Sequence, residues 1–215
     1  MRRAPFATRP FPRERHDIVD ALEVGVRRHM VHALLELDVT RARQLIRDRE
    51  AAAGERPSFT AFIVASLARA LDADRRLQAY RDWRGRLVLF DEVDVVTLLE
   101  SEVDAVAIPH VVRALRSDPN WLKRTAGTTL VTSVGMFGSG TGWAVGIVPL
   151  HTLGLTVGGI TRTPGLVGDR VEAREYLAVT ASIDHDVVDG APAARFARRL
   201  RALVEGAEVL QDLAR

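Results

Sequence analysis

The chain has 215 residues, 47% of them apolar and 27% charged, so it is long enough for a sizeable core, and disorder is excluded for the chain as a whole. It contains no cysteine, which excludes a disulfide framework, a thiolate nucleophile and a zinc site built on cysteine. Its 30 basic and 28 acidic residues are interleaved, no apolar run approaches the ~20 residues that cross a bilayer, and no secretory signal is visible. We therefore expect a cytoplasmic protein that binds neither nucleic acid nor a membrane.

The first half of the chain is expected to combine strands and helices. Residues 1–12 carry three prolines and show little periodicity, which indicates an N-terminal arm. Apolar and polar positions alternate in residues 30–40 and predict a half-buried strand. Thr40 would then cap a helix that Gly54 ends, and Ser58 would open a second helix. The apolar stripe of that helix is Phe59, Phe62, Ile63, Leu67, Ala70 and Leu71.

The second half is expected to consist mainly of strands joined by turns. A turn at residues 83–85 precedes strands at 87–90, 93–99 and 103–112, and the proline and asparagine at 119–120 are expected to break the chain. Glycine turns join further strands at 128–134, 143–148, 152–160 and 175–183. A last helix would start near Pro192, present Phe196, Leu200 and Leu203 to the core, and end near Gly206. The order of elements predicts one mixed α/β domain over residues 13–215.

Residues 135–142, Gly-Met-Phe-Gly-Ser-Gly-Thr-Gly, form the most glycine-dense stretch. A phosphate-binding loop of the Walker type would need a lysine and a following helix, whereas here a strand-like segment follows and lysine is absent. Turns between strands are therefore favoured over a nucleotide-binding loop.

Residues 182–190, Ser-Ile-Asp-His-Asp-Val-Val-Asp-Gly, place three carboxylates around His185. On a strand, Asp184 and Asp186 would point to one face and His185 to the other, so only a turn could gather them around a metal, and no metal site is predicted. A histidine satisfied by polar neighbours, and an Asp189 that only complements the start of a helix, are the structural alternatives. The functional hypothesis pairs His185 as a base with a hydroxyl of Thr132 or Ser133. This pairing suits direct acyl transfer to an external thiol, amine or alcohol.

Two segments resemble one known family. Residues 182–196, Ser-Ile-Asp-His-Asp-Val-Val-Asp-Gly-Ala-Pro-Ala-Ala-Arg-Phe, are similar to the Asp-His-Arg-x-x-Asp-Gly-Ala signature and following Ala-Arg-Phe helix of the acyltransferase core of 2-oxoacid dehydrogenase complexes. Residues 132–138, Thr-Ser-Val-Gly-Met-Phe-Gly, resemble that family's Ser-Asn-Leu-Gly-Met-Phe-Gly segment. Residues 38–40, Arg47 and residues 58–62 are similar in order and spacing, so the likeness runs from about Arg13 to the C-terminus. Chloramphenicol acetyltransferase shares only His-x-x-x-Asp-Gly.

The resemblance implies a chloramphenicol acetyltransferase-like fold, in which a mixed β-sheet with flanking helices assembles into trimers or a larger cage with active sites between subunits. It implies that His185 takes the proton from the thiol of dihydrolipoamide or coenzyme A as that thiol attacks a thioester. Thr132 of a neighbouring subunit would donate a hydrogen bond to the oxyanion, and Asp189 would orient the loop. The residues expected against the substrate are Ser133, Gly135 and Gly190. Coenzyme A or lipoamide would be a substrate, and a separate lipoylated protein or other dehydrogenase components would be partners.

The sequence departs from the family pattern at three places. Asp186 stands where the family has arginine, and a carboxylate beside the histidine is expected to favour the imidazolium and so to disfavour the free base. Ser133 replaces an asparagine, and residues 103–109 lack a glycine and a longer loop. The chain also shows no lipoyl domain, alanine- and proline-rich linker or subunit-binding domain. The alternative hypothesis is therefore a catalytically degenerate trimeric scaffold or interaction core.

Overall fold

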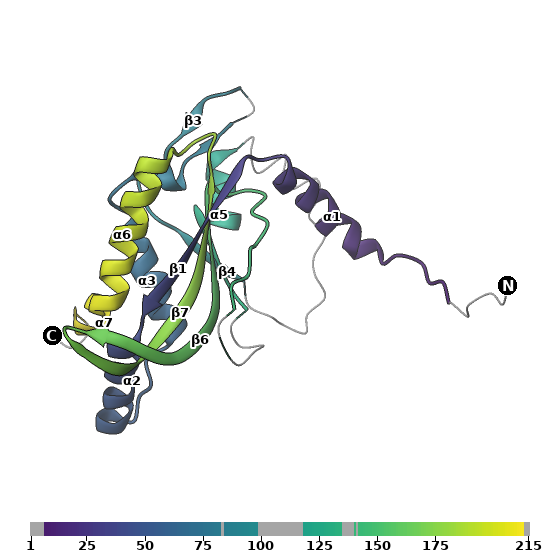
Figure 1. Ribbon diagram of the computed structural model, residues 1–215. Helices are drawn as coiled ribbons and strands as arrows, with labels where there is room; N and C mark the ends of the chain where they lie inside the picture. Colours follow the sequence, from purple (N-terminus) through teal and green to yellow (C-terminus); the bar gives the residue numbers. More distant parts are fainter. Residues whose placement is uncertain (1–6, 83, 99–117, 135–139, 141, 213–215) are drawn as a thin grey trace.

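A five-stranded mixed sheet forms the centre of the computed structural model, which describes residues 7–82, 84–98, 118–134, 140 and 142–212 (Figure 1). The strands are β1 Met30–Asp38, β4 Val95–Leu98, β5 Thr129–Ser133, β6 Leu153–Val167 and β7 Arg170–Asp184. They lie in the order β1-β7-β6-β5-β4; β7 is antiparallel to both neighbours, and β4, β5 and β6 are parallel. The predicted strand at 103–112 and Gly135 lie outside the described residues. A separate small hairpin pairs β2 Tyr80–Arg81 with β3 Leu87–Val88.

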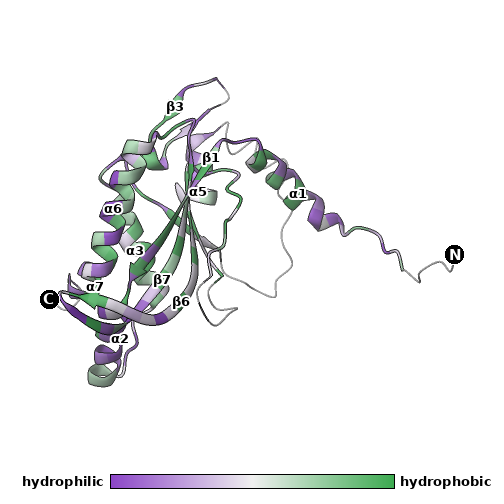
Figure 2. Cartoon of the chain, in the orientation of Figure 1, coloured by the Kyte–Doolittle hydropathy of each residue, from purple (hydrophilic) through white to green (hydrophobic). Residues whose placement is uncertain are grey.

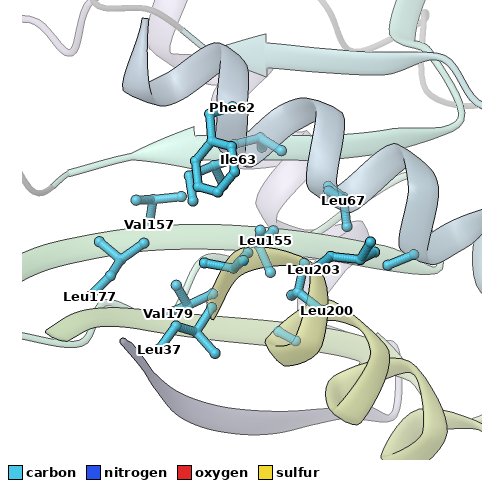
Figure 3. Close-up of a cluster of buried hydrophobic side chains, with 14 of the residues drawn as sticks. Leu37, Phe62, Ile63, Leu67, Leu155, Val157, Leu177, Val179, Leu200 and Leu203 are labelled. Atoms are coloured by element: carbon cyan, nitrogen blue, oxygen red, sulfur yellow. The ribbon is translucent and has the colours of Figure 1, made fainter. Parts of the chain in front are cut away.

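Helices cover one face of this sheet (Figure 1). They are α2 Thr40–Ala53, α3 Phe59–Leu71, α6 Gly190–Gly206 and α7 Glu208–Asp212, and a 3-10 turn, η1 Arg75–Gln78, follows α3. The core lies between this helical layer and the sheet (Figure 3). Residues that meet there include Leu37, Phe62, Ile63, Leu67, Leu155, Val179 and Leu200. The predicted stripes of both long helices are thus confirmed, and the mixed α/β prediction is correct.

The opposite face of the sheet is covered by residues 142–150. The predicted strand at 143–148 is wrong, because this segment does not join the sheet ladder. It lies across β6, and glycines in the strand allow the close approach: a Cβ at Gly158 would overlap the carbonyl oxygen of Gly142, and one at Gly154 would meet Val148 at 2.6 Å. Val148 is therefore buried against the sheet, whereas Trp143, Val145 and Ile147 of this segment are exposed.

The structure confirms two of the three capping predictions for α2 and α3. Ser58 caps α3 by accepting a hydrogen bond from the Ala61 N–H, and Gly54 ends α2 at φ 71°, both as predicted. Thr40 does not cap α2; its N–H donates to Asp38 Oδ1, and its own hydroxyl accepts from the N–H of Glu175 in β7.

Besides the short α7 and the 3-10 turn η1, two helices were missed by the sequence analysis. One is α5 Pro119–Ala126, where Asp118 accepts from the N–H groups of Asn120 and Trp121, so the proline opens a helix instead of breaking the chain. The other is α1 Arg13–Val26, which lies away from the helical layer and carries apolar side chains on its surface (Figures 1 and 2). No helix in the described parts of the chain is long and apolar enough to cross a membrane.

Candidate active site

His185 lies on a tight turn directly after β7. The N–H groups of Val187 and Val188 both donate to the carbonyl of Asp184, at 3.1 and 3.0 Å, and reverse the chain before α6 begins at Gly190. The side chain of Val188 is buried in the core and anchors the end of the turn there. The N–H of His185 donates to the carbonyl of His29 at 2.9 Å, while the imidazole itself is exposed. The turn is therefore held by its backbone and its neighbours, and the imidazole is available to a substrate.

The residue before His185 forms a buried ion pair. Asp184 Oδ2 accepts from Arg28 Nε at 3.0 Å and from Nη2 at 2.5 Å, and both side chains are only 8% exposed. Arg28 Nη1 also donates to the carbonyls of Val148 and His151, at 2.9 and 2.6 Å. Arg28 thus ties together the start of β1, the end of β7 and the segment that covers the sheet.

The residue after His185 has cationic partners of its own. Asp186 Oδ1 bonds His29 Nδ1 at 2.9 Å, and Arg81 Nη2 lies 3.6 Å from Oδ2. The hydrogen bond from His29 holds the pKa of Asp186 below its usual value, and the charges of His29, Arg81 and Arg28 act in the same direction. The turn that could have gathered the three carboxylates is present, yet the described residues contain no group of three or more metal-ligating side chains.

Asp189 is placed at the start of α6 but does not cap it. Its backbone is extended, and its side chain forms no capping hydrogen bond. The exposed carboxylate lies close enough to Arg76 to help raise the pKa of that guanidinium, after the larger effect of Asp74. Gly190 is the first residue of the helix, with open space where a Cβ would be.

Thr132 and Ser133 lie on opposite faces of β5. Ser133 faces the helical layer, where it lines a cavity of about 250 Å³ together with Phe59, Thr60 and Ile63. Thr132 faces the other side, in register with Thr156 of β6, which in turn pairs with Thr180 of β7. Both hydroxyl-bearing residues are half-buried. The structure therefore separates the proposed oxyanion donor from Ser133, one of the residues expected against the substrate.

His185 and Thr132 do not meet within one chain. His185 lies five residues beyond Thr180 along the direction of β7, and Thr180 is two strands away from Thr132. Strand geometry makes this about 17 Å along the sheet and about 10 Å across it, or about 19 Å in total. A reaction that needs both groups requires the Thr132 of a second copy.

Sequence reasoning missed two residues of this site, Arg28 and His29. They belong to no motif, and their partners lie more than 150 positions later in the chain. Only the pairing of β1 with the end of β7, through Met30 and Asp184, brings them to the turn. The arginine just before an alternating strand offered no local signal of this role.

In the comparison with known proteins, residues 112–211 match the model of the family described as 2-oxoacid dehydrogenases acyltransferase (catalytic domain). A curated relative, the dihydrolipoyllysine-residue acetyltransferase component of the pyruvate dehydrogenase complex of Acholeplasma laidlawii, is 31% identical over 112 residues. That match covers 52% of this chain and 20% of the relative, so the chain spans about a fifth of the length of this relative.

Solved structures match nearly the whole chain. The cubic core of a pyruvate dehydrogenase multienzyme complex aligns with a TM-score of 0.77 at 18% identity, over 96% of this chain and 94% of that one. The dihydrolipoamide acetyltransferase of Azotobacter vinelandii aligns at 0.74 and 18%, over the same shares. A chloramphenicol acetyltransferase aligns at 0.50 and 19%, over 81% of this chain and 85% of that one. The C-terminal half of this chain is therefore related to the acyltransferase catalytic domain of the 2-oxoacid dehydrogenases, and the described residues have that domain's fold.

Proposed function

We propose that this protein is an acyltransferase that moves an acyl group between a thioester of coenzyme A or dihydrolipoamide and an acceptor thiol. The observation that carries the proposal is the placement of His185. It stands exposed on a braced turn, inside the segment that matches the acyltransferase family. The acetyltransferase of Azotobacter vinelandii was investigated for the catalytic role of a serine, a histidine and an asparagine four positions after that histidine. Thr132, His185 and Asp189 follow the same order, with the same spacing between the last two.

The proposed reaction needs no covalent intermediate on the protein. His185 accepts the proton of the attacking thiol, and the resulting thiolate sulfur forms a bond to the thioester carbonyl carbon. The hydroxyl of Thr132 donates a hydrogen bond to the oxyanion of the tetrahedral intermediate. When that intermediate collapses, the carbon–sulfur bond of the original thioester breaks, and the leaving thiolate takes the proton back from His185. Asp189 orients the turn without reacting.

Because the two groups lie about 19 Å apart in one chain, the proposed site forms between copies. Exposed apolar side chains offer a surface for this assembly on the face of the sheet away from the helices. They are Leu34, Val134, Trp143, Val145 and Ile147, at 38–55% exposure. A second copy is the occupant proposed for this surface, as a trimer or a larger cage. Replacing Trp143 with Glu should shift sedimentation toward a smaller species and remove activity, whereas an unchanged sedimentation coefficient would contradict this assignment of the interface.

The direct test follows transfer from a panel of acyl-CoA donors to dihydrolipoamide. His185→Ala should lower kcat by ~10²–10⁴-fold because the base is lost. Thr132→Ala should lower kcat by ~10²–10³-fold because one oxyanion donor is lost. His16→Ala, at an exposed histidine of α1, is the matched control. Activity retained at the wild-type level in His185→Ala would reject the proposed base. A wild-type protein that assembles but transfers no acyl group would favour the scaffold hypothesis.

A mixing experiment tests the proposal that the site is shared. One variant carries His185→Ala and the other carries Thr132→Ala, and each is expected to be inactive by itself. Equal amounts of the two are mixed, denatured and refolded together. If assembly is random, about a quarter of the interfaces join an intact His185 to an intact Thr132 of the neighbour, and activity returns in proportion. A mixture that stays as inactive as its components, although sedimentation confirms mixed assemblies, would place the two groups in separate sites.

A further inference from the structure

Two consecutive residues before β1 hold both neighbours of His185. Arg28 binds the carboxylate of Asp184, and His29 binds the carboxylate of Asp186. The carbonyl of His29 also accepts the hydrogen bond from the N–H of His185, which lies between the two aspartates. The contact between Arg28 and Asp184 is buried, whereas His29 is 79% and Asp186 32% exposed.

We propose that His29 and Asp186 form a clamp that positions His185, so that Asp186 is an anchor of the catalytic turn and not a sign of lost activity. This inference rests on the proposed acyl transfer and names two positioning residues for it. The aspartate stands where the family pattern has arginine, and in this chain its neighbours are suited to a carboxylate. An arginine there would have neither the imidazole nor Arg81 as a partner.

The charges around Asp186 support this assignment. Three cationic or basic groups face its carboxylate: His29 at 2.9 Å, Arg81 at 3.6 Å, and Arg28, which acts through space. The backbone N–H of Asp186 donates to Asp184 Oδ1 at 3.1 Å, so the two ends of the turn are also linked to each other. Because Asp186 is an ionised acceptor, His29 Nδ1 carries the hydrogen of their bond.

The substitution Asp186→Arg separates the two hypotheses by the sign of its effect. If the aspartate only disfavours the free base, restoring the family's arginine should raise kcat. If the clamp operates, the contact between Asp186 and His29 is lost, and the new guanidinium faces the like charges of Arg81 and Arg28. The value of kcat should then fall by about fivefold or more. A rise in kcat for Asp186→Arg would overturn the proposal.

Neutral substitutions measure the contact itself. His29→Asn and Asp186→Asn should each lower kcat by about two- to fivefold, the range for a partly exposed ion pair, with little change in the KM of the acyl donor. The double variant should be no worse than either single variant, because both remove the same contact. Asp91→Asn, which removes an exposed ion pair with Arg75 at 2.6 Å, is the matched control and should leave kcat unchanged. Losses that simply multiply in the double variant would contradict the clamp.

A measurement independent of activity keeps the clamp and the proposed function apart. Hydrogen–deuterium exchange of a peptide over residues 184–188 reports the hydrogen bond from the N–H at position 185 to His29. Exchange there should be faster in His29→Asn and Asp186→Asn, and should stay slow in His185→Ala and Asp91→Asn. Unchanged exchange in His29→Asn and Asp186→Asn would refute the clamp. Full activity in His185→Ala would refute the proposed base, and the exchange measurement would still decide whether the clamp exists.

Discussion

Replacing Arg28 with Met should destabilise the protein strongly. The unbranched methionine keeps much of the arginine stem but removes every hydrogen-bond donor. Asp184, only 8% exposed, then loses both its contacts to the guanidinium, at 3.0 and 2.5 Å. The carbonyls of Val148 and His151 lose their shared donor as well.

The expected cost follows from this burial. Breaking a buried ion pair by removing one partner leaves an uncompensated charge and costs about 3–5 kcal/mol. For a chain of this size each kcal/mol lowers Tm by about 2–4 °C, so the melting temperature should fall by about 10 °C.

Urea unfolding followed by circular dichroism measures this loss, with protein concentration held constant because the proposed assembly would also contribute to stability. Arg27→Met is the matched control, because Arg27 is 82% exposed and its ion pair with Glu23 is long, at 4.0 Å. That variant should lose less than about 1 kcal/mol. Equal losses in the two variants would show that the buried pair does not brace the His185 turn, and the reasoning would fail.

Two further predictions concern His151, which directly follows the segment that covers the sheet, and Gly158, on which that segment packs. Burial lowers the pKa of His151 to about 4, and the charge of Arg28 acts in the same direction. Between pH 6.5 and 4, this histidine therefore binds a proton more readily in the unfolded state than in the folded state. Stability should therefore be lost as the pH falls through this window, by about 3 kcal/mol in total, and His151→Gln should flatten this part of a pH series of urea unfolding curves. Gly158→Ala should lower Tm, because its Cβ would overlap the Gly142 carbonyl, whereas Gly142→Ala meets nothing within 4 Å. Equal melting temperatures for the two alanine variants would argue against this close packing.

Local signals predicted those elements whose cause is local. The alternation in residues 30–40 corresponds to β1, the stripe from Phe59 to Leu71 to α3, and the cap by Ser58 and the left-handed Gly54 to the observed helix boundaries. The family motifs likewise identified both segments that carry His185 and Thr132. These features depend on residues a few positions apart, so a single sequence is enough to find them.

Most of the features that were missed depend on distant partners. Residues 143–148 have the alternation of a strand, but the covering segment packs on the glycines of β6 instead of pairing at a sheet edge. Helix α5 is the exception, because its signals are local: Asp118 caps the helix and Pro119 suits the first helical turn, whereas the sequence analysis expected the proline to break the chain. The β6–β7 hairpin extends beyond the predicted strands because its outer residues pair with each other, and not with the core.

The interpretation of Asp186 illustrates why a departure from a motif cannot be judged within the motif. Along the sequence, the aspartate differs from the family's arginine and stands directly beside the histidine, which suggests damage to the base. In space, its carboxylate bonds a histidine 157 positions earlier and lies 3.6 Å from Arg81. A carboxylate that already has cationic partners exerts less influence on a neighbouring imidazole than a free one, because their charges oppose its own. The argument for a degenerate scaffold therefore loses its main electrostatic support.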